Sequence, residues 1–534
     1  MSEAADPQSV PDTGSQSLSM AGGGNPWLVA IVVSIATFME VLDISIANVS
    51  LRYIAGDLAA GPDESTWVLT SYLVSNAIVL PISGWLANAV GRKRFYMSCV
   101  ALFTISSLLC GFAPSLTWLI IFRVMQGIGG GGLAPSEQSI LADTFRPDQR
   151  GMAFALYGIA VVFAPAIGPT VGGWISDNYS WRWVFLLNVP VGIFSLALSY
   201  FVLHTPPAEE QRRKKLLAKG FRIDYIGFAL VAVGLGCLQV VLDKGERDDW
   251  FSSNFILTFA IASGVALIAL VPWELLRPDP IVELRLFFNR GFAACCAVMF
   301  GFGFIMLGTT QLLPQLTQDL FGYTATLAGL VITPGGFAVM ICMPFIGLLL
   351  KFIQPRTVVA IGLIIEVLAL FHLSGATLQV DYSYFMWARI FQAVGVAFLF
   401  VPITTAAYVG LPANKTNEAS ALINVMRNLG GSVGISMCQT ALAEFSQRHQ
   451  LRLIEHLTPY DRAYREALPR IAEQIHATPA SPKPFAVLMA EVQRQAAMLS
   501  YIEIFYILAG LTAVMLPLIF LIKTVKPGEA PAGH

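Results

Sequence analysis

Residues 118–132 read WLIIFRVMQGIGGGG, and residues 384–398 read YFMWARIFQAVGVAF. At this offset of 266 residues, Arg123 matches Arg389 and Gln126 matches Gln392. Earlier in each half, PISGWL at 81–86 resembles PFIGLL at 344–349, and basic residues follow both. Two similarities in the same order at nearly one offset indicate an internal repeat. The repeat predicts two homologous helix bundles, with a substrate path at the interface between them.

The chain is too apolar for a water-soluble protein. Of its 534 residues, 55% are apolar and 13% are charged, and the mean hydropathy is +0.65. Soluble domains carry about 25% charged residues, so a soluble multidomain enzyme and a disordered or fibrous chain are excluded. The net charge of −1 gives no basis for nucleic-acid binding. All seven Cys lie in apolar segments, which disfavours disulfides and a thiolate metal site.

Fourteen segments are long and apolar enough to cross a membrane, because a spanning helix needs about 20 mostly apolar residues. The apolar runs are continuous, whereas the strands of a membrane barrel alternate. The sequence therefore predicts an all-α polytopic membrane protein. The predicted spans lie near 27–48, 67–86, 95–112, 117–140, 151–175, 183–203, 224–242, 254–274, 291–318, 324–350, 357–374, 383–408, 418–442 and 501–523.

The distribution of Lys and Arg predicts the orientation of these spans. Seven segments on one side carry 19 of these residues, and the opposite short loops carry 4. We therefore expect the basic side, with both termini, to face the cytoplasm. The first 26 residues are polar and contain no Lys or Arg. We expect no cleavable signal peptide there, and we expect the first span to act as the insertion signal.

The spans and the repeat divide the chain into six, two and six transmembrane helices. We expect a polar N-terminal tail at 1–26, a six-helix bundle at 27–203, and a basic linker with two extra transmembrane helices at 204–277. A second six-helix bundle is expected at 278–524 and a cytoplasmic tail at 525–534. The basic run at 208–222 is either a solvated topology signal, the simpler interpretation, or a site for anionic lipid headgroups.

Three basic residues lie inside apolar spans, namely Arg123, Arg389 and Arg427. A charge at that depth is costly, so the side chain usually faces a cavity or a partner. Two interpretations stay open: a structural pairing that holds helices together, and a direct role in ion coupling. The candidate residues of the substrate path are Gln126, Glu366, Arg389, Gln392, Asn424 and Arg427.

Carboxylates inside the spans are the candidates for binding and releasing protons, because burial favours the neutral acid. Glu40 and Asp43 share one helix face, and two such carboxylates disfavour double ionisation. Glu137 follows Arg123 by about 21 Å if the span is one helix. We therefore expect Arg123 to pair with an acid on another helix, and Asp43 is a candidate. Glu366 is either a carboxylate for cationic drugs or a protonated acid bonded to a neighbouring helix.

Glycine and proline mark the segments where helices approach closely or move. Gly84 and Gly91 permit close packing and a tight turn, and Arg92 helps to hold the loop at the headgroups. The run of four glycines at 129–132 lets a neighbour or a substrate close on the backbone, and no P-loop pattern accompanies it. Span 5 is predicted to be a smooth, kinked helix, suited either to rocking or to static packing. Its residues are Pro165, Gly168, Pro169, Gly172 and Gly173.

Residues 443–500 are too many for a short loop. Apolar residues there step by 4, 3 and 4 and form one stripe on a helix; they are Tyr464, Leu468, Ile471 and Ile475. Prolines at 479, 482 and 484 then interrupt the stripe, and 485–499 is a second amphipathic stretch. On the predicted topology this helical hairpin is external. It either docks a partner through Leu468, Ile471 and Ile475 or caps the exit of the transport path.

Several motifs resemble those of the major facilitator superfamily, specifically its fourteen-span drug:proton antiporters of the EmrB type. LDISIANVSL (42–51) resembles the first-span motif of that subgroup, GWLANAVGRKR (84–94) the loop motif between spans 2 and 3, and FRVMQG (122–127) the span-4 motif with its buried Arg. APAIGPTVGGWISD (164–177) is similar to the span-5 antiporter motif, which is the most discriminating of the set. DKGERDDWFSS (243–253) and GYTATLAGL (322–330) resemble EmrB proteins in particular.

The resemblance covers nearly the whole chain and implies the major facilitator fold and a proton-coupled exporter that works by alternating access in the bacterial inner membrane. It implicates Asp43 in proton coupling, which makes Asp43 the leading candidate beside Glu40, Arg123 and Glu137. No cofactor is expected other than the proton as coupling ion. The implied partners are membrane lipids, small hydrophobic drugs, a periplasmic adaptor protein and a TolC-like outer-membrane channel, which favours hairpin docking. One departure is Asn88, where the family has Asp, so the family's charge network lacks its acid here.

Other functions predict other features. Export of an endogenous amphiphile, such as a fatty acid or a siderophore, would use the same mechanism. A non-transporting scaffold or receptor gives no reason for acids in spans 1 and 4. A membrane enzyme finds no support in a nucleophile–base pair or a metal-ligand cluster, and ATP-driven transport finds none in a Walker-type sequence.

Overall fold

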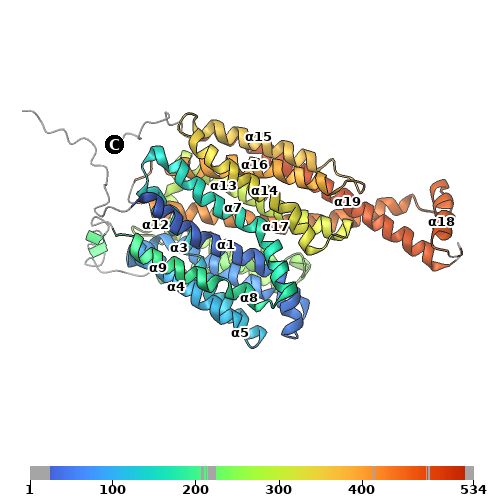
Figure 1. Cartoon of the computed structure of the whole chain (residues 1–534), viewed down its shortest axis with the longest axis horizontal. Coiled ribbons are helices and arrows are strands. Elements are labelled where there is room, and N and C mark those ends of the chain that lie inside the picture. The colour runs from blue at the N-terminus through green and yellow to red at the C-terminus, as the bar shows by residue number, and fades with distance from the viewer. Residues whose placement is uncertain are drawn as a thin grey trace, which may run out of the picture.

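The computed structural model of the chain describes residues 25–205, 210–211, 213–214, 224–412, 415–476, 478 and 481–522, almost entirely as helices (Figure 1). The predicted N-terminal tail up to residue 24, most of the basic run at 208–222, Pro479 and the C-terminal tail at 525–534 lie outside the described residues.

The N-terminal bundle is built from six membrane-crossing units. They are α1 (Pro26–Asp57), α3 (Trp67–Val90), α4 (Arg92–Gly111), α5 (Leu116–Gly130) with α6 (Leu133–Thr144), α7 (Pro147–Asn178), and α8 (Arg182–Leu186) with α9 (Asn188–Val202). The short α2 (Pro62–Ser65) leads into α3. These units correspond to the first six predicted spans.

Two linker helices and a second set of six membrane-crossing helices follow, with the shorter α18 between the last two. The linker helices are α11 (Tyr225–Lys244) and α12 (Asn254–Leu276), joined by η1 (Trp250–Ser252). After η2 (Leu284–Phe288) come α13 (Arg290–Phe321), α14 (Ala325–Leu349), α15 (Pro355–Leu373), α16 (Tyr382–Ala407), α17 (Thr416–Glu455), α18 (Arg462–Gln474), α19 (Pro482–Val514) and η4 (Leu516–Leu521).

Thirteen of the described helical units are long and apolar enough to cross a membrane. The remaining predicted span, 418–442, lies in α17, whose membrane part carries Asn417, Glu418, Asn424, Arg427 and Asn428. These polar residues lower the hydropathy of α17, and two of them bond to the other half: Asn417 to Asn88 and Asn424 to Gln138. The all-α fold with two bundles and two extra helices is confirmed.

The fourth span, predicted over 117–140, is present and is interrupted near its middle. It ends as α5 at Gly130 and starts again as α6 at Leu133. A side chain at Gly129 would lie 2.7 Å from the backbone nitrogen of Phe103, and one at Gly131 would lie 2.8 Å from the carbonyl oxygen of Asn76. The glycines therefore let neighbouring helices close on this backbone, which was one of the two predicted alternatives.

Helix α7 contacts both halves of the molecule through its small residues. Side chains at Gly168 and Gly172 would collide with Ser45 and Ile46 of α1, at 2.2 and 2.9 Å. Gly173 faces Thr326 of the C-terminal half. Pro165 and Pro169 lie inside this helix, and the freed carbonyl of Pro165 accepts a hydrogen bond from Ser45 at 3.2 Å.

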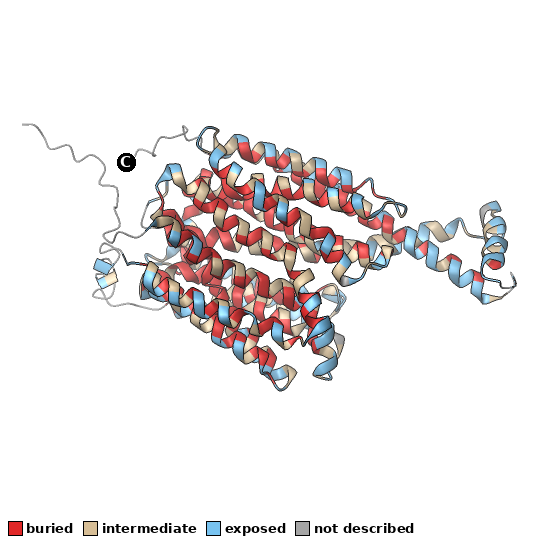
Figure 2. Ribbon diagram, in the orientation of Figure 1, coloured by how far each residue is buried: buried red, intermediate tan, exposed pale blue. Residues whose placement is uncertain are grey.

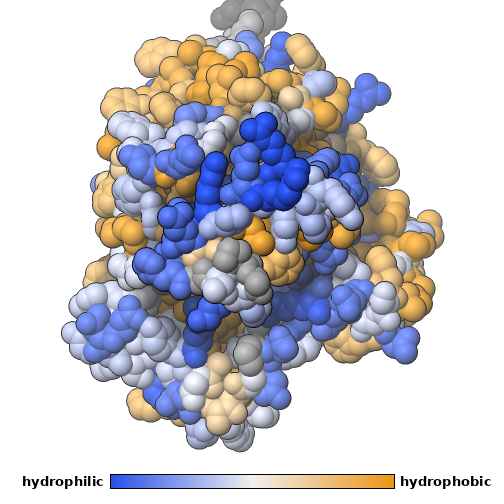
Figure 3. All heavy atoms as spheres, turned by 90° about the vertical axis from the view of Figure 1, so that its right-hand side faces the viewer, coloured by the Kyte–Doolittle hydropathy of each residue, from blue (hydrophilic) through white to orange (hydrophobic). Residues whose placement is uncertain are grey.

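The end of the molecule where α1 begins and η4 ends is called the termini end, and the opposite end is the hairpin end. Figure 1 shows α18 and the adjoining parts of α17 and α19 projecting from the hairpin end, away from both bundles. Buried residues fill the bundles, whereas the projecting hairpin is mostly exposed (Figure 2). Figure 3 looks along the helices at this end and shows hydrophilic residues over its centre and hydrophobic residues at its flanks.

The predicted hairpin is present, and its apolar stripe faces partly inward. Tyr464, Leu468 and Ile471 are half-buried by the rest of the hairpin, and Ile475 is exposed. At the hairpin base Arg448 of α17 donates to both carboxylate oxygens of Glu503 of α19 at 2.6 Å. The hairpin extends outward instead of folding over the bundles, which disfavours the capping interpretation.

Candidate functional site

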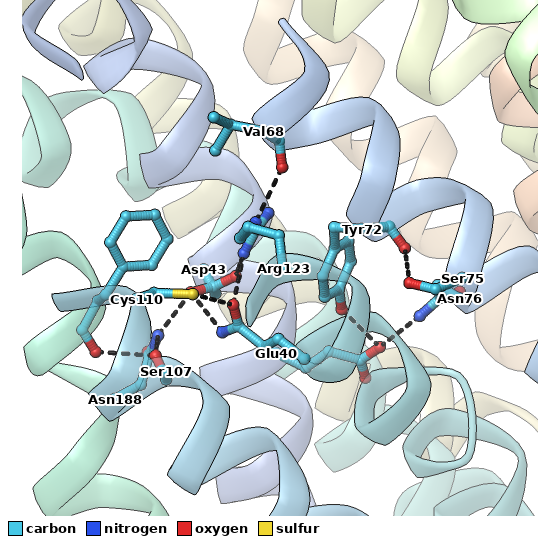
Figure 4. Close-up of polar contacts among 12 residues, drawn as sticks. Glu40, Asp43, Val68, Tyr72, Ser75, Asn76, Ser107, Cys110, Arg123 and Asn188 are labelled. Atoms are coloured by element: carbon cyan, nitrogen blue, oxygen red, sulfur yellow. Dashed lines mark hydrogen bonds and ion pairs between the residues drawn. The ribbon is translucent and has the colours of Figure 1, made fainter. Parts of the chain in front are cut away.

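A completely buried ion pair occupies the middle of the N-terminal bundle. Arg123 of α5 places Nη1 2.6 Å from Oδ2 of Asp43 of α1, and neither side chain is exposed to solvent (Figure 4). The pairing of Arg123 with an acid on another helix is confirmed. Removing either charge alone would leave the other uncompensated in a low dielectric, which is strongly destabilising.

Neutral groups complete the shell of this pair. Asn188 of α9 and Gln126 of α5 donate to Oδ1 of Asp43 at 2.6 and 3.0 Å. Gln126 also accepts from Arg123 Nη1 at 2.8 Å, and Arg123 Nε donates to the carbonyl of Val68 at 3.0 Å. The Tyr72 ring lies 4.4 Å from the guanidinium carbon, a cation–π distance. Gln126 is thus a member of this buried network and does not line the bundle interface.

Two further buried carboxylates lie beside this network, each with one oxygen free. Glu40 Oε1 accepts long hydrogen bonds from Asn76 at 3.4 Å and Tyr72 at 3.5 Å, and Glu137 Oε2 accepts from Thr37. The other oxygens, Glu40 Oε2 and Glu137 Oε1, have no hydrogen-bond partner among the described residues. Neither carboxylate forms an ion pair with Arg123, but Tyr72 joins Glu40 to the network of Asp43, because its hydroxyl bonds to Glu40 and its ring lies over Arg123.

An arginine of the other half of the chain acts electrostatically on these two acids. The charge of Arg427 on α17 acts on both Glu40 and Glu137, and Glu40 also acts on Glu137. The side chain of Arg427 is half-buried, and its Nη1 has no partner among the described residues. The free oxygens Glu40 Oε2 and Glu137 Oε1 are buried without a partner among the described residues, and an unpaired negative charge is costly to bury.

The C-terminal bundle holds a second buried guanidinium with its own acid. Gln392 of α16 donates to Glu366 of α15 at 3.0 Å and to Thr309 of α13 at 2.7 Å. Arg389 donates to Gln392 at 2.7 Å and to Thr310 at 3.0 Å. The predicted path residues Glu366, Arg389 and Gln392 thus lie together within one bundle and not at the interface.

At the termini end the two halves are in direct contact. Asn88 of α3 donates to Glu418 of α17 at 3.0 Å and accepts from Asn417 at 2.7 Å. A side chain at Gly84 would lie 2.9 Å from the Asn417 carbonyl oxygen. Asn88 of the loop thus bonds to a carboxylate of the opposite half. Arg92 forms an ion pair with Asp143 at 2.6 Å within its own half.

Closer to the centre, amides and aromatic rings join the halves. Asn424 donates to Gln138 at 2.9 Å, and Gln138 donates back at 3.4 Å. Asn424 is therefore the predicted path residue that bonds to the other bundle. Gln138 and Asn188 were not predicted, although each is a polar residue inside a predicted span, which is the signal that would have found them.

Comparisons with known proteins agree with this architecture. The family model described as Major Facilitator Superfamily matches residues 33–435. The multidrug export protein EmrB of Haemophilus influenzae is 41% identical over 82% of this chain and 85% of its own length. EmrB of Escherichia coli K12 is 36% identical over 93% and 95%. The fatty acid resistance protein FarB of Neisseria gonorrhoeae is 34% identical over 94% and 97%.

Solved structures show the same fold at much lower identity. The proton:xylose symporter XylE matches 94% of this chain and 97% of its own with a TM-score of 0.60 and 14% identity. The human organic anion transporter MFSD10 matches 92% and 99% with a TM-score of 0.58 and 12% identity.

Proposed function

Since this chain belongs to the major facilitator superfamily, as one of its EmrB-type multidrug transporters, we propose that it exports hydrophobic and amphipathic compounds in exchange for protons. It is a multi-pass membrane transporter and not an enzyme. Three features go beyond this family membership and are part of the proposal: the coupling ion, the residues that bind it and the direction of transport.

The observation that carries the proposal is a pair of buried carboxylates within electrostatic reach of one arginine. Glu40 and Glu137 each keep an oxygen without a partner among the described residues, and the charge of Arg427 acts on both. The exchangeable proton therefore belongs to this pair. Asp43 already accepts three hydrogen bonds and pairs with Arg123, so its role is to hold Arg123 and the helices around it.

Alternating access links this proton to the substrate. In the structure the halves are in contact at the termini end, which by the Lys and Arg distribution is the cytoplasmic end. When the bundles part there, Arg427 moves with its own half, away from Glu40 and Glu137. Without that cation the pair holds protons more firmly, whereas a cationic substrate next to the pair favours proton release. Proton and cationic substrate thus compete for one negative charge.

The test is drug:proton antiport by the purified full-length protein in liposomes. Ethidium uptake driven by an imposed pH gradient should fall at least about a hundredfold in Glu40→Gln and in Glu137→Gln, because neither variant has an exchangeable proton. Exchange of ethidium against ethidium, which needs no proton, should persist. The matched control is Glu366→Gln, which removes a buried acid from the other bundle and should keep gradient-driven uptake. Full proton-driven uptake by both Glu40→Gln and Glu137→Gln would overturn the assignment.

A second candidate substrate class is a fatty acid, and the FarB relative favours it. Arg427 would offer its guanidinium to the carboxylate, and its Nη1 has no partner among the described residues. Arg427→Gln should then reduce oleate transport more than ethidium transport. Equal losses for both compounds would remove this candidate.

We further propose that the protein works in the bacterial inner membrane and that its hairpin docks a periplasmic adaptor that leads to a TolC-like channel. Three exposed residues on the hairpin support this proposal. Leu451 is 66% exposed and Tyr460 is 90% exposed, and Ile475 is also exposed. Leu468 and Ile471, the predicted docking residues, are half-covered by the hairpin itself.

The docking proposal is tested by changing the exposed residues. Leu451→Ser with Tyr460→Ser should weaken adaptor co-purification by about tenfold, since each buried apolar side chain contributes roughly 1.5–3 kcal/mol. Liposome antiport should be unchanged. Unaltered adaptor binding would contradict the proposal.

A further inference from the structure

Two aromatic pairs close the interface between the bundles near the termini end. Phe154 of α7 stacks on Tyr408, next to the end of α16, with ring centroids 5.6 Å apart and an angle of 3° between the rings. Tyr157 of α7 stacks on Phe400 of α16 at 6.1 Å and 20°. Phe154, Tyr157 and Phe400 are completely buried, and Tyr408 is 6% exposed. Each pair joins one half of the molecule to the other.

The amide pair described above belongs to the same layer. Gln138 and Asn424 are completely buried, and Gln138 also donates to the Tyr157 hydroxyl at 3.4 Å. The Tyr408 hydroxyl and Ser420 are 2.7 Å apart. Rings and amides therefore form one continuous layer in which each half satisfies the other.

Opening of the bundles at this end separates Phe154 from Tyr408, Tyr157 from Phe400 and Gln138 from Asn424. The stacked rings then lose their faces of contact, and the two amides lose each other. The ligand that restores both kinds of contact is flat, aromatic and edged with hydrogen-bonding groups. An aliphatic amphiphile restores neither, although it is equally hydrophobic.

We propose that this layer, the four rings with Gln138 and Asn424, becomes the binding site for planar aromatic compounds when the bundles part at the termini end. The inference rests on the proposed function, whose substrate class it narrows. The layer adjoins the proton site, because Gln138 follows Glu137 in the chain and the charges of Glu137, Glu40 and Arg427 all act on Tyr157. A compound that separates Gln138 from Asn424 therefore acts next to the carboxylate that holds the proton.

The test compares two cationic probes of different shape on the purified full-length protein in detergent, without a pH gradient. Ethidium is planar and aromatic, and dodecyltrimethylammonium is aliphatic. The double variant Phe154→Leu with Phe400→Leu breaks both ring pairs but keeps the apolar volume. Its dissociation constant for ethidium should rise about tenfold, since it loses two stacking contacts. Its dissociation constant for dodecyltrimethylammonium should change less than about twofold.

The matched control is Phe371→Leu, which removes an equal ring from a pair on the outside of the bundle. Phe371 is 59% exposed and lies 5.7 Å from the Tyr506 ring; its variant should bind both probes as the wild type does. Phe154→Tyr keeps the ring and should retain ethidium affinity, which separates loss of stacking from loss of folding. Equal changes for both probes in the double variant, or no change for either, would overturn the inference. Selective ethidium binding without proton-driven uptake in liposomes would instead contradict the proposed function and leave this site standing.

Discussion

The two bundles each bury one arginine, and they balance its charge in different ways. In the N-terminal bundle Arg123 contacts Asp43 directly at 2.6 Å. In the C-terminal bundle Gln392 lies between Arg389 and Glu366 and bonds to both. The Arg and the Gln keep their repeat positions, but the acid has moved from one helix to another.

The contacts of two equivalent glycines show where the acid lies in each bundle. Thr309 lies 266 residues after Asp43, which is the offset of the repeat, so it takes the equivalent position on the first helix of the second bundle. A side chain at Gly129 would meet the backbone of Phe103, and one at the matching Gly395 would meet Glu366. Glu366 therefore occupies in the second bundle the position that Phe103 has in the first.

The comparison separates charge balance from proton exchange. Each bundle links one buried arginine to one acid, directly in the first and through Gln392 in the second. Glu40 and Glu137 are additional buried acids of the N-terminal bundle, and Arg427, whose charge acts on both, belongs to the other half. We infer that the first bundle carries the proton and that the second centre is structural.

The largest expected effect is the loss of the direct ion pair. Arg123→Ala leaves Asp43 buried without a counter-charge, so we expect the free energy of unfolding of the purified protein to fall by about 3–5 kcal/mol. Denaturant unfolding monitored by circular dichroism measures this. Adding Asp43→Asn removes the unpaired charge and should recover part of the loss. A wild-type denaturation midpoint for Arg123→Ala would show that the pair contributes nothing to stability.

A smaller effect is expected at the C-terminal centre, where no direct ion pair exists. Glu366→Gln should lower the free energy of unfolding by about 1–3 kcal/mol, because Arg389 loses the acid that balances it. Thr309→Asp, added to Glu366→Gln, moves the acid back to the helix that carries it in the first bundle. If the comparison is right, this addition restores stability; a further loss would break the proposed equivalence of Thr309 and Asp43.

The two glutamines sharpen the same comparison. Gln392 is the link between Arg389 and Glu366, whereas Arg123 and Asp43 still touch without Gln126. We therefore expect Gln392→Ala to cost about 1–2 kcal/mol and Gln126→Ala less than about 1 kcal/mol. Thermal unfolding of the two variants in one detergent gives the order directly. The reverse order would mean that the C-terminal centre does not depend on its bridge.

The smallest effect is expected outside both bundles, where the same chemistry is solvated. Glu503 pairs with Arg448 and lies 2.9 Å from His449 at the base of the hairpin. Glu503→Gln should cost no more than about 1 kcal/mol, and less at high salt, because exposed ion pairs are weak and screened. A loss as large as that of Arg123→Ala would show that burial does not determine the strength of these pairs.

The sequence was sufficient for the fold because the signals for it are local. Continuous apolar runs, the Lys and Arg distribution and the repeat around Arg123 and Arg389 each use neighbouring residues. The break between Gly130 and Leu133 and the interruption of the apolar pattern in α17 were less predictable, because they depend on which helix lies opposite.

The site was partly predictable for the same reason. The apolar surroundings of Arg123, Glu40 and Glu137 mark them in the sequence, and the pairing of Arg123 with Asp43 follows from charge. The rotation of each helix about its axis decides which polar residues face which neighbour. Gln126 therefore bonds to the ion pair, whereas Asn424 bonds to Gln138 of the other half, and the sequence of a single span does not predict this rotation.

The measurement that tests the central claim most directly is proton release on substrate binding. Ethidium added to the purified protein in weakly buffered detergent should release close to one proton per molecule bound, measured with a pH indicator dye. Release should disappear in Glu40→Gln and in Glu137→Gln, and persist in Glu366→Gln. Release that survives in both Glu40→Gln and Glu137→Gln, and disappears in Glu366→Gln, would contradict the account.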